Sequence, residues 1–174
     1  MSWRTERPGA DEYFSYYENY ISKVPDGDII ATLDRQLGET SGILKSIPEA
    51  KGAHRYAPGK WSIKELVGHV TDAERVFTFR ALWFGRGSPS EQPGFDENLW
   101  VPAAGADRLR LADLVAEYEA VRRSSLALFR SFDDAGALRR GVANGKAVSV
   151  RALAWIIAGH DRHHLGVLRE RYLG

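Results

Sequence analysis

Residues 153–173 read LAWIIAGHDRHHLGVLRERYL, the pattern of a core helix that three histidines interrupt. A helix turns by about 100° per residue, so two of the histidines share one side with the apolar residues. That side collects Leu153, Ile156, Ile157, His160, His164, Val167 and Leu168. Burying a polar group without a partner costs on the order of 1 to 3 kcal/mol. We therefore expect another group in the protein to satisfy both imidazole rings.

Three other segments of the chain share this helical periodicity of apolar residues. Pro48 ends the first of them, and the capping-box pair Ser62 and Glu65 begins the second. Ser149 is placed to cap the histidine-containing helix. The predicted helices cover residues 28–47, 62–84, 111–132 and 149–173. Four long amphipathic helices predict an all-α fold, a four-helix bundle formed as a single domain over residues 1–174.

The segments between these helices predict shorter structures. Five aromatic rings crowd residues 13–20, which predicts an ordered aromatic N-terminal arm packed on the bundle. Residues 85–100, GRGSPSEQPGFDENLW, hold three Gly and two Pro and predict a long loop. Residues 139–150, RRGVANGKAVSV, carry the turn signal Asn144-Gly145 and predict two short extended pieces.

Composition narrows the function. The 24 Lys and Arg residues against 23 Asp and Glu leave a net charge of +1, without the basic excess of a nucleic-acid-binding protein. No stretch approaches the roughly 18 apolar residues of a membrane span, and residues 1–14 lack an apolar signal region. We expect a cytoplasmic protein that binds neither nucleic acid nor membrane. Cysteine is absent, so a metal would have to use His, Asp or Glu.

Three histidines form a candidate metal site. His160 and His164 lie one helical turn apart, and His69 falls within the apolar stripe of the second helix. A bundle can bring these two helices together. Three neutral imidazoles with open coordination positions are typical of catalytic zinc sites, and nickel and iron also suit imidazole. The alternative is a structural cluster in which the rings hydrogen-bond to one another and to carbonyl groups.

Other polar residues near these positions have two interpretations each. His163 also lies within a turn of His160, but it is about 80° from the centre of the apolar face, so we assign it to the rim or to solvent. His54 lies in a turn-rich stretch and is expected to be exposed. Asp72 follows His69 by one turn and would either orient a ligand ring or remain a solvated carboxylate.

Two known metal motifs come close without fitting. Residues 160–164, HDRHH, resemble the zincin pattern H-E-x-x-H, but aspartate is one methylene shorter than glutamate and no third ligand follows. Di-iron bundles need Glu-x-x-His pairs, whereas Glu65 and His69 are four residues apart. Both assignments are disfavoured.

With these histidines and the segments around them, the sequence resembles the DinB-like superfamily of damage-inducible and YfiT-like metalloenzymes. The matching segments are APGKWSIKELVGHVTDAERVF (57–77), PGFDENLW (93–100) and AGHDRHHLGVLRERYL (158–173). The resemblance implies an up-down-down-up four-helix bundle, commonly a homodimer, with a divalent metal on three histidines. Carried onto this chain, the ligands are His69, His160 and His164, which are also the three that helical periodicity selects.

The resemblance also bears on chemistry. Similar proteins include transferases and isomerases that use the low-molecular-weight thiols bacillithiol or mycothiol, while many others have no assigned activity. Asp96 and Glu97 would supply acid-base groups or form an exposed acidic turn. Arg162 and Arg169 would bind an anionic substrate or form ordinary surface ion pairs.

Two functions follow as hypotheses. The first is a metal-dependent enzyme acting on a small molecule, in which Zn, Ni or Fe activates water or a small thiol. The water version is a hydrolase and the thiol version an S-transferase. The second is a non-catalytic metal-binding bundle that serves stress response or ligand binding. A nucleic-acid-binding role is disfavoured by the near-zero net charge.

Overall fold

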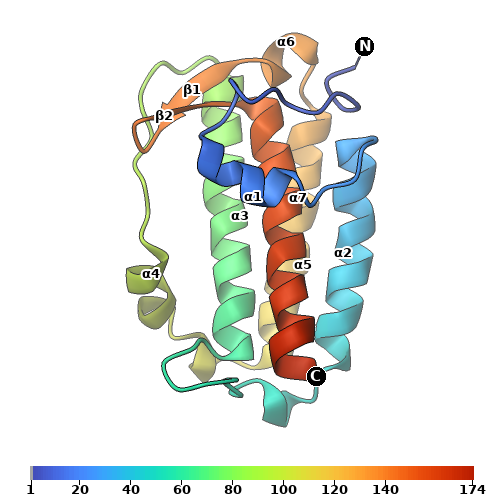
Figure 1. Cartoon of the computed structure of the whole chain (residues 1–174), viewed down its shortest axis with the longest axis vertical. Helices are drawn as coiled ribbons and strands as arrows, with labels where there is room; N and C mark the ends of the chain where they lie inside the picture. The colour runs from blue at the N-terminus through green and yellow to red at the C-terminus, as the bar shows by residue number, and fades with distance from the viewer. Residues whose placement is uncertain (1) are drawn as a thin grey trace.

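The computed structural model describes residues 2–174, and four long helices run along its long axis (Figure 1). They are α2 (Ile29–Ser46), α3 (Ile63–Gly85), α5 (Leu111–Arg130) and α7 (Val150–Val167). Helix α3 packs against α5 and α7, and α2 packs against the same two helices. Consecutive helices α2 and α3 therefore occupy opposite corners of the bundle. In Figure 1, α2 and α7 descend while α3 and α5 ascend, which confirms the predicted up-down-down-up four-helix bundle.

The helix starts follow from capping side chains. The Asp28 carboxylate accepts hydrogen bonds from two amides in the first turn of α2. Ser62 and Glu65 form the predicted capping box of α3, and the Ser149 hydroxyl accepts from the Ala152 amide at 3.0 Å. Each cap satisfies amides that the first turn of a helix leaves without a partner. All of these starts agree with the sequence prediction.

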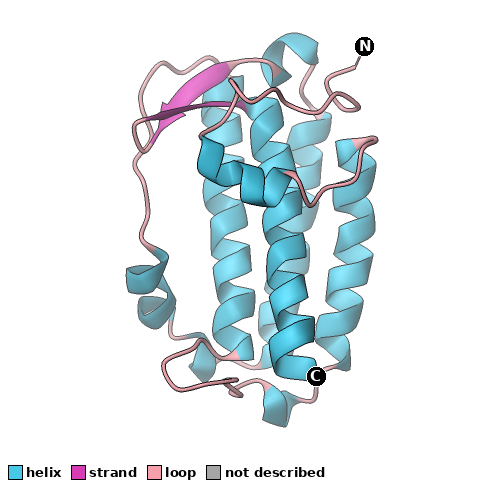
Figure 2. Ribbon diagram, viewed as in Figure 1, coloured by secondary structure: helices cyan, strands magenta, loops and turns pink. Residues whose placement is uncertain are grey.

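The shorter elements lie at the ends and along the sides of the bundle (Figure 2). They are η1 (Ser15–Tyr17), α1 (Glu18–Ile21), η2 (Glu49–Lys51), α4 (Glu97–Ala104), η3 (Ala106–Arg108), α6 (Asp134–Ala137), β1 (Arg140–Ala143), β2 (Lys146–Ser149) and the π-helical η4 (Leu168–Leu173). Strands β1 and β2 pair antiparallel. Asn144 and Gly145 join them with φ of 53° and 69°, the left-handed backbone of a two-residue hairpin turn. This hairpin confirms the two predicted extended pieces.

Helix α4 corrects the prediction that residues 85–100 form a loop throughout. It begins at Glu97, where the Asp96 side chain accepts a hydrogen bond from the Asn98 amide at 2.8 Å. The acidic pair is therefore a helix start, with Asp96 as the cap and Glu97 in the first turn. The sequence pattern did not reveal this helix, because α4 is short and contains Pro102.

The predicted aromatic arm is ordered and lies across α7 (Figure 1). Its Glu12 carboxylate accepts hydrogen bonds at 2.7 Å from both Arg151 Nε and Ser149 Oγ at the start of α7. The crossing is close at Gly159, where an added Cβ would lie 2.1 Å from the Tyr20 carbonyl oxygen. Glycine at this position therefore allows α1 to lie directly on α7.

Two apolar clusters fill the two ends of the bundle. One surrounds Phe84, Phe129 and Trp155, and the other contains Leu66 and Leu114. Between them lies a layer of buried polar side chains contributed by all four long helices: Gln36, Thr40, His69, Glu74, Arg122, His160 and Asp161. No helix within residues 2–174 is long and apolar enough to cross a membrane.

Candidate metal centre

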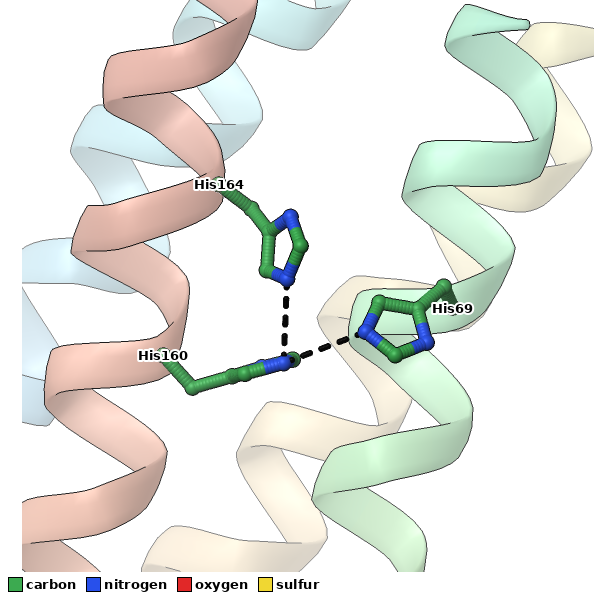
Figure 3. A group of neighbouring side chains, drawn as sticks. All are labelled: His69, His160 and His164. Carbon is green, nitrogen blue, oxygen red and sulfur yellow. Dashed lines mark hydrogen bonds between the residues drawn. The ribbon is translucent and has the colours of Figure 1, made fainter. Parts of the chain in front are cut away.

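The structure brings the three predicted histidines together in this polar layer (Figure 3). His69 projects from α3, and His160 and His164 project from successive turns of α7. The Nε2 atom of His160 lies 3.2 Å from Nε2 of His69 and 3.1 Å from Nε2 of His164. One potential ligand atom from each ring lies within 4.8 Å of the other two. The convergence is therefore confirmed, and the role of the rings as metal ligands stays a prediction.

The spacing of the nitrogens fits a shared ion. Imidazole nitrogens sit about 2.0–2.1 Å from a tetrahedral zinc ion, which places two of them roughly 3.3 Å apart. A purely hydrogen-bonded cluster fits less well, because His160 Nε2 faces two other nitrogens at once. A ring nitrogen offers either one proton or one lone pair. It cannot make two well-directed hydrogen bonds in the same plane, whereas an ion between the rings would use one lone pair from each.

Burial keeps the three rings neutral. Only 9% of His69 and 6% of His160 is exposed. Burial lowers the pKa of His69 to about 4 and the pKa of His164 to about 3. It also holds the pKa of His160 well below its usual range, and the neighbouring His164 and His69 add to the effect. Neutral imidazoles carry the lone pairs that a metal ion requires.

Aromatic side chains surround the histidines. Trp61, immediately before the α3 cap, lies with its ring 4.8 Å from the His69 ring. Tyr20 of the N-terminal arm meets the edge of the His160 ring at 5.3 Å, and Phe77 of α3 lies 6.1 Å from the same ring. These walls account for the low exposure of the imidazoles. The helical pattern alone gave no sign of Trp61 or Tyr20.

The remaining histidines and Asp72 lie where the more conservative interpretations placed them. His163 sits half-buried beside the site, with its ring 5.0 Å from the His164 ring. His54 is exposed in the connection between α2 and α3. Asp72 pairs with Arg75 at 3.1 Å at the bundle edge and makes no hydrogen bond to a histidine within residues 2–174. Asp72 is therefore not an orienting partner of His69.

The acidic candidates lie near the histidines, whereas the basic candidates lie away from them. Asp96 is used as the α4 cap, which leaves Glu97 as the carboxylate near the site. Glu97 is exposed, and its charge slightly opposes the lowering of the His69 pKa. Arg162 and Arg169 line a small hollow on the opposite side of α7. The prediction that these two arginines form surface ion pairs is wrong, because neither of them pairs with a carboxylate within residues 2–174.

A cavity of about 320 Å³ reaches His164 from the surface, while His69 and His160 lie behind its lining. His163 and His164 form one wall, and Trp61 and Lys60 form another. Asn98 of α4 completes the lining on the side of the long connection. A small molecule could thus approach the exposed edge of His164 without any change in the bundle.

Comparison with known families identifies the chain. The sequence profile described as the DinB superfamily matches residues 32–168, which hold all four long helices and the three histidines apart from the first three residues of α2. The chain belongs to the DinB superfamily. A search of curated proteins finds no match.

Solved structures extend the comparison of this DinB protein. YfiT from Bacillus subtilis, described as a probable metal-dependent hydrolase with an unusual four-helix bundle topology, superposes with a TM-score of 0.65. The match has 14% identity and covers 94% of this chain and 92% of YfiT. A mycothiol-dependent maleylpyruvate isomerase superposes with a TM-score of 0.67 at 16% identity, over 83% of this chain and 61% of the isomerase. At such identities the likeness establishes the fold alone.

The DinB bundle also holds a buried ionic network that the sequence analysis missed. Arg122 is fully buried and donates from Nε to Glu74 at 2.8 Å and from Nη2 to Asp161 at 2.8 Å. Asp161 also accepts hydrogen bonds from the hydroxyls of Tyr118 at 2.6 Å and Thr40 at 2.9 Å. The network joins all four long helices. Its signal was present, because Glu74 and Arg122 fall within the apolar stripes of their helices.

Proposed function

We propose that this DinB protein is a metal-dependent enzyme in which His69, His160 and His164 hold one divalent ion. The observation that carries the proposal is the meeting of three neutral Nε2 atoms at one point. Among the residues that the structure describes, no carboxylate joins this group. Three protein ligands leave coordination positions free, as in catalytic rather than structural zinc sites. Zinc, nickel and iron all suit such a donor set.

The chemistry proposed for the site is activation of water or of a low-molecular-weight thiol. A divalent ion held there would act as a Lewis acid and lower the pKa of either molecule. The water version makes the protein a hydrolase, in line with the description of YfiT. The thiol version makes it an S-transferase, in line with the mycothiol dependence of the isomerase. In both versions the cavity beside His164 admits the small-molecule substrate.

Metal analysis of single-histidine variants tests the ligand set. We expect about one ion per chain in the wild type and less than about a tenth of that in His69→Ala, His160→Ala and His164→Ala, because two imidazoles bind far more weakly than three. His54→Ala and His163→Ala are the matched controls and should retain the ion. Full occupancy in any of the first three variants would contradict the proposal.

The alternative function is a metal that only staples α3 to α7. The ionic network around Arg122 already ties the four helices together without an ion. We therefore expect chelation to leave the chain folded, whereas a stapling metal would be indispensable for folding. Circular dichroism before and after chelation separates the two cases. A cobalt-loaded sample whose absorption spectrum changes on adding a thiol would favour the S-transferase over the hydrolase.

The homodimer and the cytoplasmic location stay predictions. Some apolar surface is available for self-association, because Phe79 is 48% exposed and Leu82 is 38% exposed on α3. Light scattering on the purified wild type would measure the oligomeric state, and a monomer at micromolar concentration would exclude the homodimer.

A further inference from the structure

A second cavity, of about 350 Å³, lies between α3 and the connection that leads to α4. Its lining combines aromatic rings with two arginines and one carboxylate, which belongs to Asp72 and is paired with Arg75. The arginines and rings are Arg75, Arg80, Phe79, Phe95 and Trp100. Phe95 and Trp100 face each other with ring centres 5.0 Å apart and planes inclined by 38°. This cavity shares no lining residue with the one beside His164.

Arg80 is the unusual residue in this cavity. Only 3% of it is exposed, yet no carboxylate within residues 2–174 pairs with its guanidinium. Nη2 donates to the Pro93 carbonyl at 2.7 Å, while Nε is buried with no hydrogen-bond partner among the described residues. The Tyr17 hydroxyl lies close enough to interact with the guanidinium, but burial raises the pKa of Tyr17, so this side chain carries no negative charge to compensate Arg80. Burial lowers the pKa of Arg80, but a guanidinium stays protonated at neutral pH.

Two other arginines near Arg80 are each paired with carboxylates. Arg122, also buried, is bonded to two carboxylates. Arg75, in the same cavity as Arg80, pairs with Asp72 at 3.1 Å and with Glu117 at 2.7 Å. A buried charge without a partner is costly. Arg80 is thus the position in this cavity where an external anion would supply the missing partner.

We propose that this cavity binds the carboxylate of a small organic acid through Arg80, with the flat apolar part of the acid against Phe95 and Trp100. Arginine recognises carboxylates through parallel N–H donors, and Nε–H has no partner among the described residues. Because this atom is shielded from solvent, the carboxylate reaches it with a small shift of the Arg80 side chain toward the cavity. A phosphate dianion is less well matched, because the second cation in the cavity, Arg75, is already neutralised by two carboxylates. The lining thus selects a monoanion with a planar apolar body.

The location connects this cavity to the histidines. Phe77 lies between Arg80 and His160. The Arg80 guanidinium is 5.8 Å from the centre of the Phe77 ring, and the His160 ring is 6.1 Å from the same ring. Phe95, in the cavity wall, also contacts Phe77 at 6.4 Å. The inference adds a substrate class to the proposed function and in that sense rests on it, but the binding step itself needs no metal.

Calorimetric titration of the full chain with benzoate tests the proposal, with the protein both metal-loaded and chelated. We expect benzoate to bind in both states, Arg80→Met to weaken binding at least tenfold, and Arg75→Lys to stay within about threefold of the wild type. Arg75→Lys is the matched control, because it replaces the paired arginine of the same cavity while keeping a positive charge beside Asp72 and Glu117. Removing the unpaired charge should leave the thermal midpoint of Arg80→Met unchanged or higher.

Three results would overturn the inference. The first is equal binding of benzoate by Arg80→Met and the wild type. The second is binding only to the metal-loaded protein, which would place the carboxylate on the ion and leave the proposed function standing. The third needs no variant: the neutral amide benzamide binding the wild type as tightly as benzoate would show that charge is not recognised. Benzoate binding to protein that never holds metal would instead support the cavity while the proposed function fails.

Discussion

The polar layer of the bundle contains two regions that meet at adjacent residues of α7, the ionic network at Asp161 and the histidine group at His160. In the ionic network each charge has an opposite charge, and Arg122 contacts both carboxylates at 2.8 Å. In the histidine group three neutral rings direct nitrogens toward one point, and within residues 2–174 no carboxylate is a member of this group. Side chains of the protein itself satisfy the network, whereas the proposed ion would complete the histidine group. Burial of polar groups is thus compatible with two roles, stabilisation in the network and, under the proposed function, binding in the histidine group.

The largest effect should come from breaking the network at its centre. Arg122→Met removes the cation and leaves Glu74 and Asp161 buried without a counter-charge. Breaking a buried pair in this way costs about 3 to 5 kcal/mol, so we expect the free energy of unfolding to fall by that amount. Urea denaturation followed by circular dichroism measures it. Arg123→Met, the exposed neighbour on α5, should change stability by less than about 0.5 kcal/mol.

His160→Ala provides the contrast to Arg122→Met. Both variants are compared in the chelated state, so that the ion plays no part. There, His160→Ala should lower the free energy of unfolding much less than Arg122→Met does, because it removes a neutral ring and leaves no buried charge unpaired. If Arg122→Met were as stable as the wild type, the network would not be the stabilising half of the layer.

The histidine group was predictable because each part of it is local to one helix. Spacing of four residues puts His160 and His164 on one face, and the position of His69 within an apolar stripe shows that it points inward. The capping residues Ser62 and Ser149 likewise act within their own first turns. Only the pairing of α3 with α7 had to be assumed, and it follows from the up-down-down-up course, which places α2 and α3 at opposite corners and α3 beside α7.

The ionic network was not predictable in the same way, because its partners come from helices far apart in sequence. Glu74 and Arg122 meet only because α3 lies beside α5, a neighbour relation that periodicity does not specify. Arg80 shows the same limit from the other side, since a missing partner is visible only once every neighbour is placed. Helix α4 was missed for a local reason, because Pro102 and the glycines nearby outweighed the Asp96 cap.

A smaller effect is expected from acidifying the chelated protein. The pKa values of His69 and His164 are about 4 and about 3 in the folded chain, against about 6.5 when unfolded. The unfolded chain therefore binds more protons between these values, and stability falls as the pH drops below about 6.5. Each histidine that stays neutral in the fold contributes about 1.4 kcal/mol per pH unit, and none contributes above pH 7.

Urea denaturation at pH 7, 6 and 5 measures this dependence. His69→Gln should show a shallower loss of stability than the wild type, because glutamine does not titrate. His54→Ala removes an exposed histidine and should leave the pH dependence unchanged. An identical slope in His69→Gln and the wild type would mean that the buried rings accept protons as readily as exposed ones, which contradicts the geometry of the site.

The smallest effect tests whether the two regions are independent. Thr40→Val removes one hydroxyl donor from Asp161 while Arg122 and Tyr118 keep the carboxylate satisfied. We expect a loss of about 1 kcal/mol in the free energy of unfolding, the usual worth of one hydrogen bond. Thr71→Val is the control, since the Thr71 hydroxyl only bonds the carbonyl one turn back in α3. Unchanged metal content in Thr40→Val would show that the network supports the helices without tuning the histidines. A drop in metal content with little loss of stability would mean that Asp161 positions its neighbour His160, so that the stabilising half of the layer also sets the geometry of the binding half.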